Sequence, residues 1–243
     1  MKNYVLLGLS LFIGSLCFGQ TTRQLSSFDE LTVHEGIEVI LTKGTDESAR
    51  IEADGIAVDK VLTDVSGGTL KVHLEGNNNR GADVRVYITY VSLEGLSASS
   101  AGSISADERI ATDDEFEISC SSAGSIEAKI EADEIELDVS SSGDVTLEVV
   151  ASFLEAEVSS AGSIKVSGKA ASVEAYASSS GEFNGYDLEA KSAEVKASSG
   201  GSVKVNVSDE LDARASSGGS VRFKGNPSTI DKETSSGGSV RES

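Results

Sequence analysis

Carboxylates that recur at one position of a repeating pattern are the residues of this chain whose type and spacing could do chemistry. The first four follow one another at intervals of 19 residues: Glu117, Glu136, Glu155 and Glu174. The series continues at closely similar intervals with Glu194, Asp212 and Asp231. We call these seven side chains the acidic ladder, because stacking of the repeats would place them in one outward column at strand spacing.

The acidic ladder predicts either a metal site or a solvated face. Carboxylates stacked about 5 Å apart repel by about 1 kcal/mol per pair in a water-like dielectric, so we expect something to offset this repulsion. Calcium takes six to eight oxygen ligands, and Glu117, Glu136, Glu155 and Glu174 could supply several of them from adjacent repeats. The alternative is an acidic face that keeps the protein soluble and discourages lateral pairing of sheets. Calcium is the one cofactor that the sequence suggests.

The other reactive side chains form no catalytic pattern in the sequence. His34 and His73 lie in strand-like runs, and we expect them to be exposed or hydrogen-bonded strand residues rather than bases. Cys120 takes a place where other repeats have small apolar residues, which predicts a buried thiol. The chain has 40 acidic against 20 basic residues, a net charge of -20, so nucleic acid is not an expected partner.

The elements that position the ladder follow from a repeat of Ser-Ser-x-Gly, which is followed after one residue by Ile, Val or Phe. Eight copies recur every 18 to 22 residues, and they begin at Ser99, Ser121, Ser140, Ser159, Ser178, Ser198, Ser216 and Ser235. A fixed period of this length indicates a solenoid. Apolar residues alternate with polar ones on both sides of each copy, which is typical of short strands.

The fold that this pattern predicts is all-β: a right-handed parallel β-helix with coils of about 19–20 residues. Ser-Ser-x-Gly forms a corner of each coil, where we expect the glycine to supply a positive φ. A second outward column turns basic towards the C-terminus, at Lys165, Lys204, Arg222 and Arg241. The last coil ends as an open edge, which predicts self-association through it.

The chain divides into three segments. Residues 1–19 carry one early basic residue, Lys2, and an apolar run that ends in Cys17-Phe18-Gly19, so we expect a signal peptide that is cleaved between Gly19 and Gln20. The apolar run is too short for a membrane-spanning helix, and the mature chain has no other candidate. Residues 20–96 are predicted to form irregular first coils and a cap, and residues 97–243 the regular repeats, in one structural domain from 20 to 243.

The mature chain resembles the auto-transporter adhesin head domain family, also called the head GIN domain, of exported proteins from Bacteroidetes-type bacteria. The resemblance rests on the runs at residues 28–39, 68–72 and 84–89 and on the Ser/Gly repeats that follow them. It implies a single β-helix and a periplasmic, surface or extracellular location. It implies no established ligand and no catalytic residue.

These features together predict an exported, non-catalytic binding module, adhesin-like, for a glycan or a surface protein. The alternative is a structural or assembly scaffold of the envelope. A third class, a carbohydrate-active enzyme related to polysaccharide lyases, is disfavoured because the compact coils leave no long loops with which to build a cleft.

Overall fold

The structure is a computed structural model, and it describes residues 19–76 and 81–243. The predicted signal peptide therefore lies outside the described residues, except for Gly19. The N-terminal part contains β1 (Gly19–Gln24), β2 (Glu30–Val33), β3 (Glu38–Lys43), β4 (Ser48–Asp54), the short 3₁₀ helix η1 (Val58–Lys60), β5 (Val61–Ser66), β6 (Thr69–Leu74) and β7 (Asp83–Tyr90). The repeat part contains β8 (Gly95–Ala98), β9 (Ser103–Ala111), β10 (Glu115–Cys120), β11 (Ser125–Val139), β12 (Asp144–Val158), β13 (Ser163–Ala177), β14 (Glu182–Ala197), β15 (Ser202–Ala215), β16 (Ser220–Lys224), β17 (Thr229–Thr234) and β18 (Ser239–Glu242).

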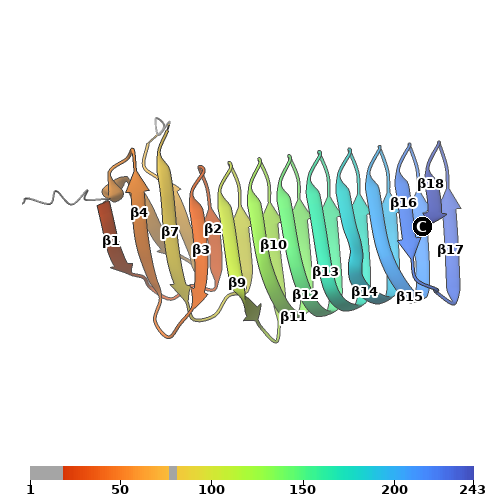
Figure 1. The fold of residues 1–243 in the computed structure, drawn as a ribbon, viewed down its shortest axis with the longest axis horizontal. Helices are drawn as coiled ribbons and strands as arrows, with labels where there is room; N and C mark the ends of the chain where they lie inside the picture. Colours follow the sequence, from red (N-terminus) through yellow and green to blue (C-terminus); the bar gives the residue numbers. More distant parts are fainter. Residues whose placement is uncertain (1–18, 77–80) are drawn as a thin grey trace, which may run out of the picture.

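The repeats form a β-solenoid in which each coil hydrogen-bonds to the next (Figure 1). One coil is a single bent strand: β11 alternates buried and exposed residues until Asp133 and Glu134, which both point outward and mark the bend. Every pairing from β8 to β18 is parallel, as in the register of β11 with β12. The predicted all-β solenoid with parallel stacked coils is thus confirmed. The short strands expected within one coil are joined into a single strand that continues through the bend.

The Ser-Ser-x-Gly segment is a tight turn that stacks on its neighbours. In the copy that begins at Ser140, the second and third residues have φ of 50° and 61°, and the amide of Gly143 donates to the carbonyl of Ser140 at 2.9 Å. Positive φ at both central residues is the mark of a type I′ turn. The third residue donates in turn to the next coil, from Ser142 to the carbonyl of Ser160 at 3.1 Å. Each turn therefore adds a hydrogen bond between coils.

The sequence predicts that the final glycine of this motif supplies a positive φ, and this reason for the glycine is wrong. The final glycine of each turn is not among the residues with positive φ, which belongs to the two residues before it. A Cβ on Gly143 would instead lie 2.5 Å from the carbonyl oxygen of Cys120 in the preceding coil. Glycine is needed because the backbones of successive coils approach closely here.

The N-terminal part is less regular than stacked coils. The coil formed by β2 and β3 lies between the strands β6 and β7 on one side and β8 and β9 on the other, so stacking order differs from chain order (Figure 1). Strand β4 pairs antiparallel with both β1 and β7, and β5 forms an antiparallel hairpin with β6. This part thus joins the coils through parallel pairs and ends in antiparallel strands.

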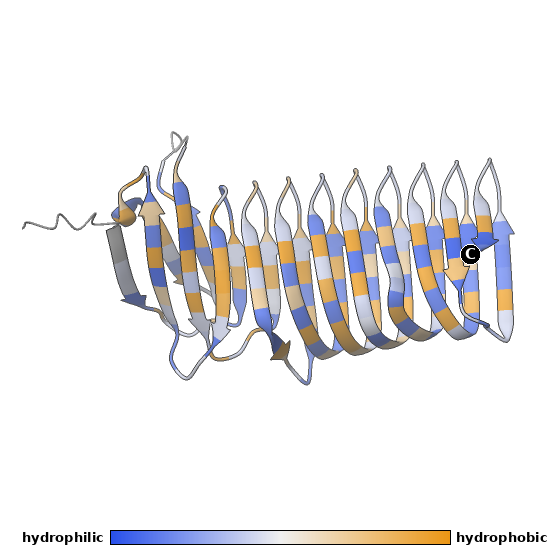
Figure 2. Ribbon diagram, in the orientation of Figure 1, coloured by the Kyte–Doolittle hydropathy of each residue, from blue (hydrophilic) through white to orange (hydrophobic). Residues whose placement is uncertain are grey.

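A continuous apolar core fills the solenoid. Inward columns of Ile, Val, Leu, Ala and Phe are buried, and no polar or charged residue is classed as buried in the part of the chain that the structure describes. Figure 2 shows the resulting bands of apolar and polar residues along each strand. Cys120 belongs to this core, as predicted, with 1% of its surface exposed. Burial in such a column stabilises the fold by about 1.5–3 kcal/mol for each large aliphatic or aromatic side chain.

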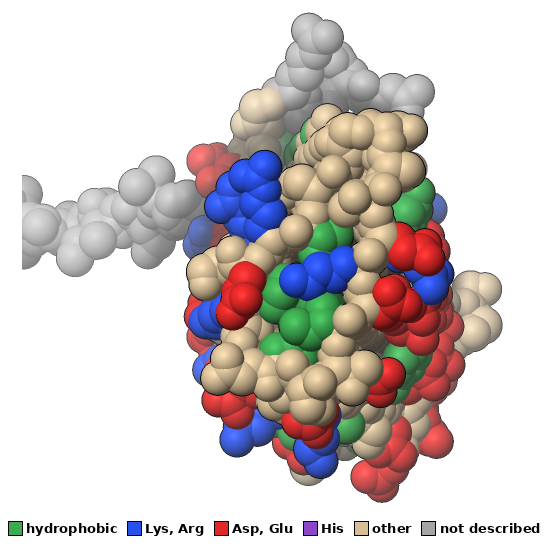
Figure 3. Space-filling view, turned by 90° about the vertical axis from the view of Figure 1, so that its right-hand side faces the viewer, with side chains coloured by type: hydrophobic (Ala, Val, Ile, Leu, Met, Phe, Trp, Pro, Cys, Tyr) green, Lys and Arg blue, Asp and Glu red, His purple; other side chains and the backbone are tan. Residues whose placement is uncertain are grey.

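The last coil carries charged residues at positions that face inward in earlier coils. Lys232 pairs in register with the buried Ala213, and its ammonium lies 4.4 Å from the ring centroid of Phe223. Glu242 pairs in the same way with Phe223. Figure 3 shows this end, with apolar side chains at the centre of the coil and a basic side chain across them. Such inward charges oppose edge-to-edge association of sheets.

Candidate binding face

The acidic ladder lies on the face built from the second half of each coil. Its members occupy successive outward positions of β10 to β15 and β17, and each is the register partner of the next: Glu117, Glu136, Glu155, Glu174, Glu194, Asp212 and Asp231. Parallel in-register pairing without a shift keeps these side chains in one column. The structure therefore places the four predicted ligands Glu117, Glu136, Glu155 and Glu174 in one column, and of these only Glu117 and Glu136 belong to a group of described carboxylates close enough to share an ion.

Three carboxylates of this face form a cluster: one oxygen atom each of Glu115, Glu117 and Glu136 lies within 4.8 Å of the other two. Glu115 was not among the predicted ligands, although its spacing of two from Glu117 puts it on the same side of β10. Partial burial and a hydrogen bond that protonated Glu136 donates to Glu115, with repulsion from Glu115, Glu117 and Glu155, raise the pKa of Glu136. Three exposed carboxylates can ligate a hard cation, and calcium binding by the ladder stays a prediction.

Charge compensation divides the ladder into two halves. Beside Glu174 and the earlier carboxylates, the adjoining outward column holds Ser119, Asp138, Glu157 and Tyr176. It then turns basic: the Lys196 ammonium lies 2.7 Å from Glu194, and the Arg214 guanidinium lies 2.8 Å from Asp212. The hydrogen bond from Lys196 lowers the pKa of Glu194. The ladder members of β14 and β15 are thus held in ion pairs, whereas those of β10 to β13 have none among the described residues.

A groove begins where this change occurs, at the ring of Tyr176. It has a volume of about 600 Å³ and is bounded by Tyr176, Lys196, Arg214, Glu233 and the serines that open three turns, Ser198, Ser216 and Ser235. Its size falls within the ~300–1,000 Å³ typical of small-ligand sites. The Tyr176 hydroxyl lies 3.0 Å from Oγ of Ser198, and the side of the ring stays open because 40% of the residue is exposed. We call this hollow the Tyr176 groove.

Small side chains make the Tyr176 groove hollow. The inward column ends here in Ala197 and Ala215, and each is followed by a serine, so no bulky side chain fills the surface between the turns and the ion pairs. Oδ1 of Asp212, on the Lys196–Arg214 side of the face, is buried without a hydrogen-bond partner among the described residues. The groove therefore combines an aromatic ring, hydroxyls, cations and carboxylates on rigid strands.

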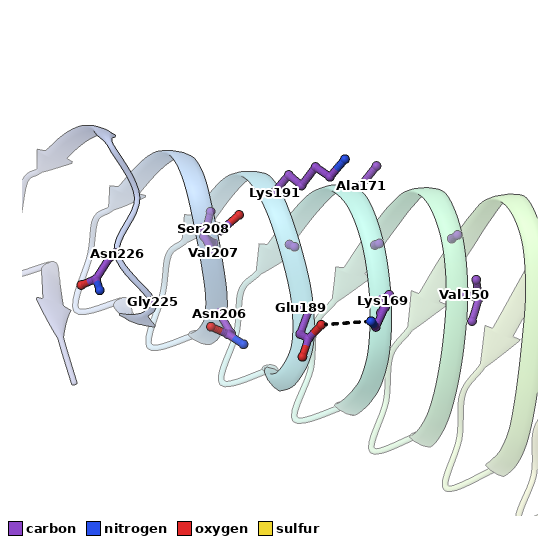
Figure 4. A pocket seen from close by; sticks show the side chains of 13 residues that line it. Val150, Lys169, Ala171, Glu189, Lys191, Asn206, Val207, Ser208, Gly225 and Asn226 are labelled. Carbon is purple, nitrogen blue, oxygen red and sulfur yellow. Dashed lines mark ion pairs between the residues drawn. The ribbon is translucent and has the colours of Figure 1, made fainter.

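A second groove, of about 540 Å³, lies at the bend of the coils (Figure 4). In β14, three residues separate Gly185 from Glu189, but their register partners in β15, Val205 and Asn206, are consecutive. The coil of β15 is therefore shorter here, and it leaves a hollow beside β14. Alanines line it, with a single ion pair, Lys169 to Glu189 at 3.5 Å. Lys191, Asn206, Ser208 and Asn226 also border it, but the described residues that line it include no aromatic ring on which a sugar could stack.

The basic column and the histidines form no reactive cluster. Lys204 and Arg222 are register partners, and the Lys204 ammonium lies 2.6 Å from Glu182. His34 Nδ1 lies 2.6 Å from Oγ of Ser99, and desolvation, with the charge of Lys71, lowers the pKa of His34. His73 Nε2 lies 3.0 Å from Asp64. Burial raises the pKa of the Cys120 thiol to about 11, so this thiol is not an activated nucleophile.

The fold and this face define a β-solenoid protein with a polar, exposed face that carries a groove. The chain matches the family described as "Putative auto-transporter adhesin, head GIN domain" over residues 27–148 and 127–227, and it belongs to this family. The resemblance inferred from the sequence is thus confirmed. No curated protein matches the chain. In the described residues, no helix has the length and apolar character needed to cross a membrane.

Solved structures show the same fold. A "putative adhesin" from Parabacteroides distasonis is 18% identical, with a TM-score of 0.83 over 92% of this chain and 96% of that chain. A "putative adhesin" from Parabacteroides merdae is 18% identical, with a TM-score of 0.82 over 92% and 95%. A "putative lipid binding protein" from Parabacteroides distasonis is 22% identical, with a TM-score of 0.80 over 92% and 96%. The family and these neighbours carry adhesin or lipid-binding descriptions rather than those of enzymes.

Proposed function

We propose that this protein is an exported, adhesin-like module that binds a glycan in the periplasm or at the cell surface without cleaving it. The observation that carries the proposal is the Tyr176 groove, in which an open aromatic ring borders fixed donors and acceptors. Tyrosine supplies a large amphipathic contact at low entropic cost, and polar side chains around it set orientation. Membership of the adhesin head family supports the binding role.

Export is part of this proposal. It rests on the basic and apolar N-terminal segment that ends at Gly19, and the adhesin family supports it. The first described strand, β1, begins at Gly19 and pairs with β4, so the predicted cleavage after Gly19 would leave nearly all of β1 in the mature chain. Mass spectrometry of the secreted protein tests this point, because cleavage there gives a mature N-terminus at Gln20.

A scaffold role is the second candidate, and the last coil favours it. Each of β17 and β18 pairs on one side, with β15 and β16 respectively, so one backbone edge of each is open to another chain. In this role the rod would self-associate end to end or bind an envelope protein. The inward Lys232 opposes such contact and makes the scaffold the less favoured of the two.

Retention on glycans separates these functions. The purified protein is incubated with immobilised surface and host glycans, with calcium or with chelator, and both retained protein and released fragments are measured. Retention without release is the expected result. Loss of retention on chelation would implicate calcium binding by the acidic ladder, and release of fragments would point to a lyase or hydrolase. If the protein is not retained and no fragments are released, the scaffold role is favoured.

A further inference from the structure

We propose that the Tyr176 groove selects uncharged saccharides over acidic ones. This inference rests on the proposed glycan-binding function and adds the class of ligand. Three features of the groove carry it: a restrained aromatic platform, ion pairs that present donors and acceptors side by side, and an excess of negative charge.

The platform is the ring of Tyr176. Its position in β13 is the register partner of Lys196 in β14, and its hydroxyl reaches two residues further, to Ser198 in the following turn. The ring therefore leans across the surface of the next coil and is held at both ends, by the backbone and by the hydroxyl. A platform fixed before binding loses little conformational entropy when a ligand stacks on it. The C–H face of a sugar ring is such a ligand, because it presents apolar, weakly positive hydrogens to the negative face of the aromatic ring.

The rim is a set of ion pairs centred on Arg214. The guanidinium lies 2.8 Å from Asp212, 3.6 Å from Glu233 and 4.0 Å from Glu194. Arginine only donates and ionised carboxylates only accept hydrogen bonds, so the rim alternates donors with acceptors on adjacent side chains. Pairs of neighbouring hydroxyls, which both donate and accept, match this alternation.

The charge balance of the rim argues against anionic ligands. Lys196, Arg214 and Glu233 line the groove, and Glu194 and Asp212 pair with the two cations from outside this lining, so the ion-pair network around the groove sums to -1. The acidic ladder continues beyond Tyr176 with Glu174 and Glu155, in a chain of net charge -20. A carboxylated or sulfated sugar would meet like charge here and would find both cations already paired. Repulsion of the wrong ligand is a source of specificity in its own right.

Calorimetric titration tests this inference. The purified protein is titrated with neutral manno-, xylo- and galacto-oligosaccharides and with oligogalacturonate of matched length. We expect at least one neutral series to bind at least tenfold more tightly than oligogalacturonate, and we expect Tyr176→Ala to weaken that binding tenfold or more. Tyr176→Phe keeps the ring and should cost threefold or less. Tyr186→Ala is the matched control. Tyr186 lies in the first half of β14, where its hydroxyl hydrogen-bonds to Ser243, and it does not line the groove.

One further variant and a folding check complete the test. Glu233→Gln removes one unit of negative charge from the rim, so the preference for neutral over acidic sugars should shrink. Thermal unfolding of each variant shows whether it is folded. Equal or tighter binding of oligogalacturonate, or unchanged binding by Tyr176→Ala, would overturn this inference while leaving a glycan-binding function. If the protein binds no saccharide at all, including the immobilised glycans of the first assay, both this inference and the glycan-binding function are overturned.

Discussion

The α-carbon of Gly201 faces the carbonyl oxygen of Ala177 in the preceding coil so closely that an added Cβ would lie well inside 3.0 Å of this oxygen. The obstacle is backbone, which cannot move without breaking the bonds between coils. We expect Gly201→Ala to lower the free energy of unfolding by about 3 kcal/mol, as overpacking at a tightly packed site does. Urea unfolding followed by circular dichroism measures this change.

The neighbouring Gly200 supplies the control. It has φ of 75°, and the nearest atom to an added Cβ is Oγ of Ser180 at 3.7 Å. Ala161 takes the same turn position in another coil with φ of 60°, so alanine is tolerated there. Gly200→Ala should change stability by no more than about 1 kcal/mol. Equal destabilisation by the two variants would contradict the close-approach explanation.

The repeat part could be predicted from the sequence because each level of the pattern agrees. The eight Ser-Ser-x-Gly copies set the period, and alternation identifies the inward columns. The N-terminal part could not be predicted in the same way. Alternation in Val84–Ile88 shows that β7 has two faces, but it does not say that β7 pairs antiparallel with β4 and parallel with β3. Partner and direction depend on long-range contacts that leave no local mark.

Glu136→Gln should stabilise the protein at neutral pH. Because the pKa of Glu136 is raised in the fold, the folded state binds more protons than the unfolded state between the ordinary value of 4.5 and the folded value. Its charge is therefore unfavourable above the folded pKa, and this cost disappears as the pH falls through that pKa to 4.5. We expect a gain of about 0.5 kcal/mol at pH 7, typical of relieving like charges across strands, and no gain below pH 4.5.

Glu194→Gln is the matched variant in the same ladder and should have the opposite sign. The hydrogen bond from Lys196 lowers the pKa of Glu194, so its charge stabilises the fold above pH 4.5, and this contribution is lost as the pH falls through the folded pKa. Urea unfolding of both variants at pH 7 and pH 4 compares them. A loss of stability in Glu136→Gln at pH 7 would show that the carboxylate is compensated, for example by a bound cation.

Lys232→Leu should promote association through the last coil. The change removes the charge that lies over Phe223 and leaves an apolar side chain at the open end of the core. Light scattering over a range of concentrations should show a higher mass than in the unaltered protein. Lys129→Leu, an exposed outward position of β11, controls for the gain of a surface leucine. Equal masses for the two variants would remove Lys232 from the account of this end.

Cys120 should resist alkylation in the folded protein. Its thiol is buried and its pKa is raised to about 11, so the thiolate is scarce at pH 8. Iodoacetamide at pH 8 should label Cys120 at least a hundredfold more slowly in native buffer than in urea, as measured by mass spectrometry. Rapid native labelling would mean that this coil opens locally.

The candidate site could be predicted only in part. Equal spacing was sufficient to place Glu117, Glu136, Glu155 and Glu174 in one column, because in-register stacking converts sequence interval into position. The Tyr176 groove was missed because Tyr176 has no counterpart in its column. Its value as a platform arises from the reach of its hydroxyl to Ser198, twenty-two residues later, and from the ion pairs of Arg214. Side-chain direction and charge pairing are not encoded in the period of the repeat.

On our proposal, this protein is a binding module whose ligand lies in the Tyr176 groove. Amide hydrogen exchange, with and without a neutral saccharide that binds the protein, is the most direct test. We predict slower amide exchange at residues 196–198 and 214–216, which border the groove, and unchanged exchange at residues 134–139 in the acidic half of the face. Protection confined to the alanine-lined bend at residues 150–151 and 169–171, or no protection at saturating saccharide, would contradict the account.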